Sequence, residues 1–334
     1  MMKIKIILLI SIIINLKTSA QEIHVLTSGK KISIRGLSVV DDNILWASGS
    51  NGTVARSTNG GKTFQWLVIK DFEKRDFRDI EAFDSNTAII MAVAEPAIIL
   101  KTKDGGETWK EVFRDTTKGM FLDAMDFVGS NGVVIGDPVN NKIFMAYTND
   151  FGDSWKNSPI VNNIKIEEGE AFFASSGTNI KLWNDKFPIF VSGGKKSSLY
   201  FSSTSHHTLP IIQGQESTGA NSIAIFPGKS SKAIVVGGDF AKDTGTTNNC
   251  TLVTLMPFQF QQPQTPPHGY RSCVEYISEN KLIACGTSGV DISNDGGMNW
   301  QLISKESFHV CQKAKKSMSV FLAGSNGKIA KLNW

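Results

Sequence analysis

Arginines stand beside carboxylates in several strand-like segments of this sequence, a combination suited to binding anions. Arg35, Arg78 and Arg271 each interrupt a run of apolar or small residues, and Asp79 directly follows the second of them. A guanidinium group can hold a carboxylate, sulfate or phosphate with two parallel hydrogen bonds. Because a charge within an apolar strand is costly unless it is paired or used, these residues mark a candidate site.

The three arginines occupy one repeated position. Seven segments, aligned on their aromatic or β-branched ends, hold at this position Arg35, Arg78, Leu122, Glu170, Asn221, Arg271 and His309. The next position holds Gly36, Asp79, Asp123, Ala171, Ser222, Ser272 and Val310. A closed repeat structure would gather these side chains around one central mouth. The candidate ligand-binding residues are therefore Arg35, Arg78, Asp79, Asp123, Glu170, Asn221, Tyr270, Arg271 and His309.

Three interpretations of this ring are open. In the first, its arginine-rich side binds an anionic group. In the second, three arginines clamp a carboxylated sugar while Tyr270 or Glu170 acts as nucleophile and Asp79 or Asp123 as acid/base. In the third, the charges line a water-filled channel and neutralise one another, in which case the ring has no ligand.

Repeats set the framework that must position these residues. An octet with a Gly-containing turn and a closing aromatic begins at residues 57, 102, 148 and 293. The copies are Ser57 to Phe64, Thr102 to Trp109, Thr148 to Trp155 and Ser293 to Trp300. Residues 21–334 divided by seven give about 45 residues per unit, the length of one four-stranded propeller blade. In each octet the Asp or Asn suits the turn and the glycine supplies a positive φ, so we interpret the octets as structural.

Alternating strands without helical periodicity predict an all-β chain. An apolar second strand recurs seven times, beginning at Ile44, Thr87, Gly132, Pro188, Ala233, Lys281 and Ser319. The last unit has only three strands, whereas Glu22 to Thr27 alternates without a unit of its own. The sequence thus predicts a single seven-bladed β-propeller of four-stranded blades over residues 21–334. Its N-terminal strand should complete the last blade and leave no open seam.

The octets resemble the Asp-box, or BNR, pattern Ser/Thr-x-Asp-x-Gly-x-Thr-Trp of sialidases and sortilin-like receptors. Several further phrases resemble the bacterial photosystem II stability/assembly factor-like propellers: Phe77 to Phe83, Gly169 to Ser175, Val236 to Phe240, Gly269 to Ser272 and Gly286 to Gly289. This resemblance implies a propeller that holds a partner. Sialidases are a more distant match, because they have six blades and an Arg-Ile-Pro opening where this chain has Arg35, Gly36 and Leu37.

We therefore favour a scaffold or assembly-type binding module over a sialidase-like glycosidase that acts on a carboxylated or sulfated glycan. The expected partners are an acidic peptide, a client protein or an anionic glycan. Whether any catalysis occurs stays open. We expect no nucleic-acid partner, because the formal net charge is only +4 and three of the lysines lie within residues 1–20.

Residues 1–20 have the pattern of a signal peptide. Lys3 and Lys5 give a short positive start, Ile4 to Leu16 is almost wholly apolar, and small residues lead to Ala20. The pattern predicts export to the periplasm or the extracellular space, cleavage before Gln21 and no membrane insertion of the mature chain. We expect a monomer, although no feature of the sequence fixes the oligomeric state.

The four cysteines leave a further question open. Cys273 and Cys285 flank a polar turn and could face each other across a hairpin, either as a disulfide or as buried thiols. No Cys/His set has the spacing of zinc ligands, and His206 and His207 are adjacent, so they diverge in an extended chain. We expect neither a metal nor a cofactor.

Overall fold

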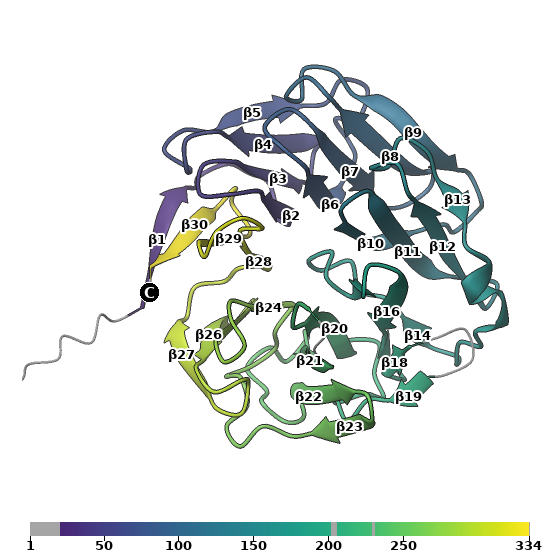
Figure 1. The fold of residues 1–334 in the computed structure, drawn as a ribbon, viewed down its shortest axis with the longest axis vertical. Coiled ribbons are helices and arrows are strands. Elements are labelled where there is room, and N and C mark those ends of the chain that lie inside the picture. The colour runs from purple at the N-terminus through teal and green to yellow at the C-terminus, as the bar shows by residue number, and fades with distance from the viewer. Residues whose placement is uncertain (1–20, 202–205, 229–230, 334) are drawn as a thin grey trace, which may run out of the picture.

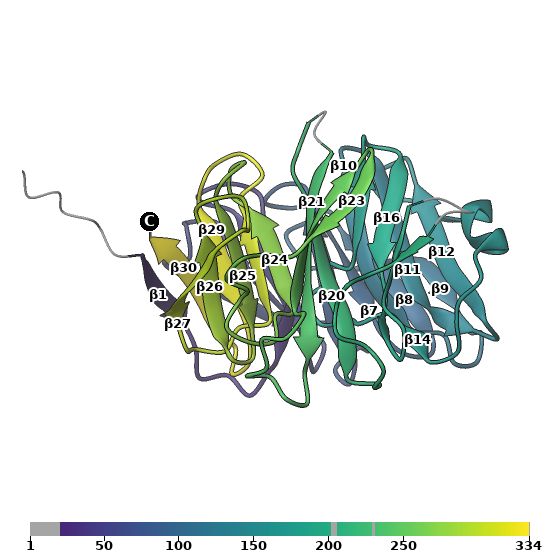
Figure 2. The same cartoon turned by 90° about the horizontal axis from the view of Figure 1, so that it is seen from below.

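The computed structural model describes residues 21–201, 206–228 and 231–333, and these form a ring of seven antiparallel sheets around a central axis (Figure 1). Seen from the side, the ring is a short cylinder (Figure 2). No helix in these ranges is long and apolar enough to cross a membrane. The seven-bladed, all-β prediction is confirmed.

Each blade is an antiparallel meander. Blade 1 contains β2 (Ile34–Val39), β3 (Leu45–Gly49), β4 (Thr53–Ser57) and β5 (Gln65–Val68), and blade 2 contains β6 (Phe77–Ala82), β7 (Ala88–Ala92), β8 (Ala97–Thr102) and β9 (Lys110–Asp115). Blade 3 contains β10 (Leu122–Val128), β11 (Asn131–Val139), β12 (Lys142–Thr148) and β13 (Lys156–Asn157), and blade 4 contains β15 (Ile180–Trp183), β16 (Phe187–Val191), β18 (Ser198–Tyr200) and β19 (His206–Thr208). Blade 5 contains β20 (Thr218–Ile225), β21 (Lys232–Asp239), β22 (Cys250–Leu255) and β23 (Phe258–Gln261), and blade 6 contains β24 (Cys273–Tyr276), β25 (Leu282–Gly286), β26 (Gly289–Ser293) and β27 (Trp300–Ser304). Blade 7 contains β28 (Val310–Lys313), β29 (Val320–Ala323), β30 (Ile329–Asn333) and β1 (Glu22–Thr27).

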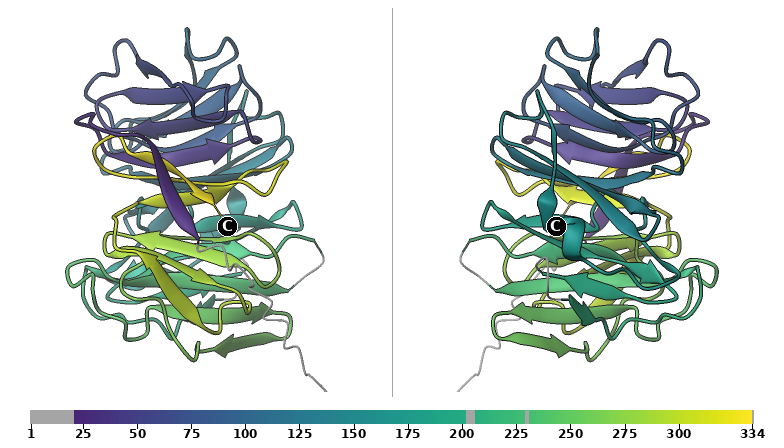
Figure 3. Two further views of the ribbon diagram at one scale, coloured as in Figure 1. Left: turned by 90° about the vertical axis from the view of Figure 1, so that its left-hand side faces the viewer. Right: turned by 90° about the vertical axis from the view of Figure 1, so that its right-hand side faces the viewer.

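The N-terminal strand completes blade 7, as predicted. β1 pairs with β30 in an antiparallel register that places Glu22 opposite Asn333 and Val25 opposite Ala330. Figure 3 shows the purple β1 beside the yellow C-terminal strands. This pairing covers the edge of β30 and joins the two ends of the described chain in one sheet.

Blade 4 departs from the predicted register. Its inner strand is β15, whereas Glu170 lies in the two-residue strand β14 (Glu170–Ala171), which pairs with β17 (Gly193–Gly194) beside blade 5. A long connection that contains the 3₁₀ helix η1 (Pro159–Asn163) precedes β14. The placement of Glu170 on an inner strand was therefore wrong. Phe172 and Phe173 have the aromatic pattern expected of an inner strand, which misled the prediction, but they belong to this connection.

The core lies in apolar layers between neighbouring blades, as sheet-on-sheet packing requires. Between blades 1 and 2, Trp46 is fully buried against Ile90 and Leu100, and its indole N–H donates to the backbone oxygen of Asp84 at 3.1 Å. Blades 6 and 7 share a similar layer that contains Cys273, Cys285 and Cys311. Cys273 and Cys285 are register partners, as predicted, and both are free thiols.

The Asp-box turns bond to themselves. In blade 2 the Thr102 hydroxyl donates to Asp104 Oδ1 at 2.8 Å and accepts from the amide of Gly106 at 3.0 Å. Asp104 also accepts from the amide of Thr108 at 3.0 Å, and the Trp109 indole donates to Gly106 O at 3.0 Å. The Thr108 hydroxyl also donates to Asp104, and this bond, together with those from the Thr108 amide and the Thr102 hydroxyl, lowers the pKa of Asp104 to about 2. All these partners belong to one turn, which agrees with the structural interpretation of the octets.

We predict that Asp104→Ala lowers the melting temperature and leaves ligand affinity unchanged, because the turn loses its acceptor while the central mouth is untouched. Since the pKa of Asp104 is depressed in the fold, its stabilising effect is present above pH 4 and disappears as the pH falls towards 2. Thermal melts of both proteins from pH 2 to 7 test this. A variant that melts normally but loses ligand binding would contradict the structural role.

Candidate functional site

Four inner strands, β2, β6, β10 and β20, each have one polar residue that a bulge places out of register near the N-terminal end of the strand. The register shifts between Ile34 and Gly36 in β2 and between Phe77 and Asp79 in β6 leave Arg35 and Arg78 as the bulged residues. β10 and β20 have the same irregularity, which places Asp123 and Asn221 at the equivalent positions. Such bulges re-aim a side chain relative to the strand. They correct the predicted ring in blade 3, where Asp123 rather than Leu122 is equivalent to the arginines.

Arg35 and Arg78 form the basic part of this mouth. The Nη1 group of Arg35 donates to the backbone oxygen of Ser175 at 3.1 Å. Burial lowers the pKa of Arg35, and the nearby charge of Arg78 lowers it further. The Cζ atom of Arg78 lies 5.9 Å from the centre of the Phe121 ring, and its Nη2 atom lies 3.4 Å from Asp76 Oδ2. The Arg78 side chain is 30% exposed. The two guanidinium groups therefore repel each other in a partly desolvated place.

His309 lies beside Arg35 but carries no charge at neutral pH. Its Nδ1 is 2.9 Å from the backbone oxygen of Ile34, which is an acceptor, so Nδ1 holds the proton and donates it. Burial lowers the pKa of His309 to about 4, and the charge of Arg35 contributes to this shift. The positive charge of the mouth thus comes from the two arginines.

The channel behind this mouth is crossed by the chain itself, through residues 174–178, which we call the plug. The Ser175 hydroxyl donates to Asn221 of blade 5 at 2.9 Å, and the Ser176 hydroxyl donates to the backbone oxygen of Ser272 of blade 6 at 2.7 Å. A Cβ on Gly177 would lie 2.3 Å from the Asp79 carboxylate of blade 2. Figure 1 shows a loop of this part of the chain entering the centre of the ring. The plug separates two mouths, so the predicted water-filled channel is not a continuous one.

Asp79 is buried beneath the plug rather than in the arginine mouth. Its carboxylate accepts from the amides of Ile80 at 2.8 Å and Met125 at 2.7 Å. Burial raises the pKa of Asp79 well above its usual range in spite of these two bonds. Asp79 therefore supports the packing of blades 2 and 3 and does not face Arg35.

Asp123 is the unusual member of the ring. It is fully buried, and neither carboxylate oxygen has a well-aligned hydrogen-bond partner within the ranges that the structure describes. Burial raises its pKa well above the usual range, and the neighbouring carboxylate of Asp137 raises it further, while Arg78 opposes this shift. Burial also raises the pKa of Asp137 to about 6. The folded state therefore favours the protonated form of Asp123.

Tyr270 and Asn221 form a fixed support for the plug. The Tyr270 hydroxyl donates to Asn221 Oδ1 at 2.8 Å, and the Ser175 hydroxyl shares that acceptor. Burial raises the pKa of Tyr270 to about 12. A phenol with a raised pKa and an engaged proton is poorly suited to act as a nucleophile.

Glu170 lies outside the ring, in keeping with the corrected register of blade 4. It is buried, and it accepts hydrogen bonds from the hydroxyl groups of Ser192 and Tyr200, the latter at 2.9 Å. Both partners belong to the region around β17 and β18. The carboxyl is consequently a structural acceptor within the blades.

Arg271 is also absent from the mouth, so the expectation of three converging arginines was wrong. Its guanidinium is fully buried and donates through Nε to Asp291 Oδ2 at 2.7 Å and through Nη1 to Ser288 Oγ at 2.8 Å. His268 Nδ1 lies 2.6 Å from the other Asp291 oxygen. The residue next along the chain, Ser272, precedes the paired Cys273 and occupies the ring position. Arg271 precedes this ring position by one residue, so its side chain points to the other side of the strand, into blade 6.

The structure therefore joins Arg35 and Asn221 through Ser175 and places Arg78 and His309 near Arg35, and it does not assemble the three-arginine clamp of the glycosidase interpretation. Sequence reasoning missed Ser175, Asp137 and Asp291. Only Asp291 had a clear signal, since it interrupts the apolar strand between Val290 and Ile292. Within the described ranges, no group of three or more His, Cys, Asp or Glu residues could hold a metal ion.

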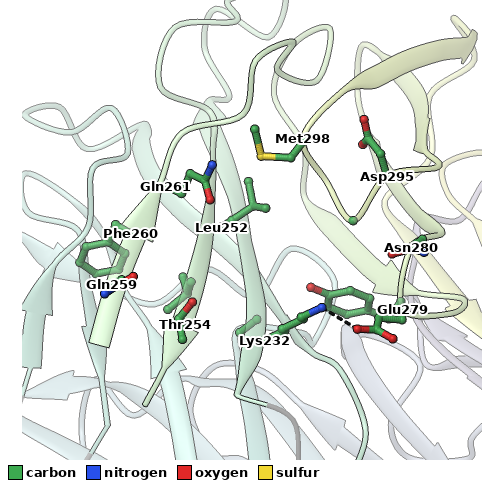
Figure 4. Close-up of a pocket in the computed structure, with 14 residues that line it drawn as sticks. Lys232, Leu252, Thr254, Gln259, Phe260, Gln261, Glu279, Asn280, Asp295 and Met298 are labelled. Atoms are coloured by element: carbon green, nitrogen blue, oxygen red, sulfur yellow. Dashed lines mark hydrogen bonds and ion pairs between the residues drawn. The ribbon is translucent and has the colours of Figure 1, made fainter. Parts of the chain in front are cut away.

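A separate groove of about 340 Å³ lies on the outer rim between blades 5 and 6 (Figure 4). Lys232 and Glu279 at its base form an ion pair, and Met298 and Leu252 close its other end (Figure 4). Its lining includes none of the predicted ring residues, and its charged pair is satisfied.

Comparisons with known proteins agree with this architecture. Residues 65–170 match the family model described as photosynthesis system II assembly factor YCF48. A solved structure titled "YCF48 bound to D1 peptide" superposes with a TM-score of 0.64 at 18% identity and covers 95% of this chain and 97% of its own. The structure of YCF48 from Cyanidioschyzon merolae superposes with a TM-score of 0.65 at 15% identity, and the match covers 94% of this chain and 99% of that one. No curated protein matches the sequence significantly. The chain is a BNR-type, or Asp-box, propeller that resembles the photosystem II assembly factor YCF48.

Proposed function

We propose that this protein is a scaffold or assembly-type binding module that holds an acidic peptide segment of a client protein at the mouth formed by Arg35 and Arg78. A similar propeller, YCF48, has been solved with a D1 peptide bound, which supports a peptide as the kind of partner.

The observation that carries the proposal is the pair of like charges that stand together without adequate compensation. Arg35 bonds to a backbone oxygen rather than a carboxylate, and the charge of Arg78 lowers its pKa. Asp76 compensates Arg78 only through a partly exposed contact. The Nε of Arg78 is also buried without a hydrogen-bond partner in the described part of the chain. A carboxylate placed between the two guanidinium groups would relieve the repulsion and use these donors.

The plug gives this mouth a fixed floor. Ser175 connects Arg35 to Asn221, and Tyr270 holds Asn221 from the other side. A preorganised floor lowers the entropy lost on binding. Association through a few charged groups should weaken as salt is added, because exposed charges are screened beyond about 8–10 Å at physiological ionic strength.

We expect the variants Arg35→Gln and Arg78→Gln each to weaken binding of a fluorescein-labelled Glu-Ser decapeptide about tenfold, which is about 1.4 kcal/mol. Gln-Ser and Lys-Ser decapeptides of equal length should bind more weakly than the Glu-Ser peptide. Fluorescence anisotropy titrations at 50 and 300 mM NaCl measure both effects.

Arg114→Gln is the matched control, because Arg114 is an exposed arginine on the outer strand β9 and pairs with Glu111. It should bind the Glu-Ser peptide like the unmodified protein. The proposed site would be overturned if the Arg35 and Arg78 variants bound the Glu-Ser peptide as tightly as the unmodified protein does. It would also be overturned if the unmodified protein bound all three peptides equally. Thermal melts accompany each titration, and removal of one repelling charge should leave the melting temperature unchanged or raise it.

The proposal places this function outside the cytoplasm, in the periplasm or extracellular space. It rests on the signal-peptide pattern of residues 1–20, which lie outside the described residues. Fractionation of cells that express the full chain, with mass spectrometry of the mature N-terminus, tests this part. Cleavage before Gln21 is the expected result. An uncleaved chain that still begins at Met1 and stays in the cytoplasm would contradict it.

A further inference from the structure

A second cavity, of about 340 Å³, lies at the opposite mouth of the channel. Arg35 and Arg78 stand at the N-terminal ends of β2 and β6, whereas this cavity is lined by residues towards the C-terminal ends of the inner strands. Gly177 of the plug and the buried Asp79 contribute to its lining and separate it from the arginine mouth. Its charged lining residues are Asp79, Glu81, Asp126, Lys181, Glu275, Lys313 and Lys315.

Two lysines in this cavity are already paired. Lys181 Nζ lies 3.0 Å from Asp126 Oδ1, and both side chains are largely buried. Lys315 Nζ lies 2.6 Å from Glu81 Oε1 and also donates to the Ala82 backbone oxygen. These two pairs leave no net charge on their four residues, and burial favours the protonated form of Asp79.

One acid and one base remain without a partner. In the described ranges, neither Glu275 nor Lys313 makes a side-chain hydrogen bond or an ion pair within 4.0 Å. They stand on adjacent inner strands, β24 and β28, and both are half-buried. Burial raises the pKa of Glu275 to about 7, although the charges of Lys181 and Lys313 oppose this shift. A half-buried acid and base that do not reach each other are costly unless something satisfies both.

We propose that this cavity binds a small zwitterion, of the size of a free α-amino acid or a dipeptide, whose ammonium group pairs with Glu275 and whose carboxylate pairs with Lys313. Its volume is at the lower end of the range for small-molecule sites, about 300–1,000 Å³, which suits such a ligand better than a segment of a folded partner. A ligand with a single charge would leave either Glu275 or Lys313 unsatisfied. The site is independent of peptide binding at the arginine mouth.

The ligand itself provides the first test. Isothermal titration calorimetry with L-α-amino acids and Gly-Gly, compared with their N-acetylated and C-amidated forms, measures how much each terminal charge contributes. We expect saturable binding of at least one zwitterion and an affinity loss of at least tenfold when either terminus is blocked. Equal binding of blocked and free forms, or no saturable binding of any zwitterion up to about 10 mM, would overturn the proposal.

The variants provide the second test. Glu275→Gln and Lys313→Met should each weaken binding of the same zwitterion at least tenfold. Glu216→Gln and Lys242→Ala remove one exposed acid and one exposed base outside this cavity and are the matched controls, which should bind normally. Affinity unchanged in both cavity variants would overturn the assignment of these two residues.

A proton readout distinguishes this site from the arginine mouth. An ammonium group beside Glu275 favours its ionised form, so binding at pH 7 should release protons, and the calorimetric enthalpy should differ between phosphate and Tris buffers. The groups that act on Glu275 are Lys181, Lys313, Asp126 and Cys273. Arg35→Gln and Arg78→Gln should leave zwitterion binding intact, so failure of either proposal can be recognised without the other. Loss of the buffer dependence in Glu275→Gln is expected, and its persistence would contradict the role of Glu275.

Discussion

Replacing Arg271 with methionine should lower the free energy of unfolding by about 3–5 kcal/mol, because it strands the Asp291 carboxylate in the interior. Both side chains are 0% exposed, and no other lysine or arginine forms an ion pair with Asp291 in the described part of the chain. Urea unfolding followed by tryptophan fluorescence measures the loss. Normal stability together with weaker binding of the Glu-Ser peptide would show instead that Arg271 serves the mouth.

Two further variants identify the origin of this loss. Arg271→Met combined with Asp291→Leu removes both charges and should recover most of the stability, since an apolar pair of similar size often replaces a buried ion pair without cost. Arg114→Met breaks the exposed pair with Glu111 and should change stability by less than about 1 kcal/mol. A double variant as unstable as the single one would show that packing, rather than the unpaired charge, causes the loss.

The propeller could be predicted because its signals are local. Each Asp-box turn is held by partners within the same octet, as Thr102, Asp104 and Thr108 illustrate, so its sequence survives wherever the turn occurs. The alternation of Glu22 to Thr27 likewise predicted a strand, and the three-stranded last unit supplied its only natural partner. These inferences needed no knowledge of distant contacts.

The ring was harder to predict because a strand's side chains alternate, so an error of one residue reverses their direction. Asp123 and Arg35 are equivalent only because both inner strands bulge at these residues. In blade 6 the same reasoning chose Arg271 instead of Ser272, and it therefore placed a buried structural arginine in the mouth. Nothing in the local sequence marks where such a bulge falls.

The plug was beyond sequence reasoning for a different reason. Ser175, Ser176 and Gly177 are small residues whose role depends on contacts with four other blades. Their composition is typical of an ordinary loop. Only the closed ring shows that this loop lies on the axis and divides the channel into two chemically different mouths.

Asp123 connects the stability of the fold with the chemistry of the arginine mouth. Its pKa is raised in the fold, which means that the folded state prefers the protonated acid. Below the unfolded pKa, near 4, the acid is protonated in both states and costs nothing, whereas at higher pH the unfolded state gains by releasing the proton and stability falls. Asp137, with a pKa of about 6, adds to this loss between about pH 4 and 6.

We therefore predict that Asp123→Asn stabilises the protein at pH 8, because the folded state disfavours the ionised acid while the unfolded state does not. The gain should vanish near pH 4, because the amide then replaces an acid that is neutral in both states. Urea unfolding at pH 4, 6 and 8 measures the trend. Asp76→Asn is the control, since Asp76 is a partly exposed partner of Arg78 and should not produce this pH dependence.

The same variant tests whether Asp123 is charged next to Arg78. A protonated Asp123 places no negative charge in the mouth, so Asp123→Asn should change the affinity for the Glu-Ser peptide by less than about twofold at pH 7. An ionised Asp123 would instead compensate Arg78, and its loss would strengthen peptide binding and destabilise the fold at pH 8. If Asp123 is protonated, the variant is more stable at pH 8 and binds the peptide as before. If Asp123 is ionised, the variant is less stable and binds the peptide more tightly. The two measurements together decide whether this buried acid leaves the positive charge of Arg35 and Arg78 available to a ligand.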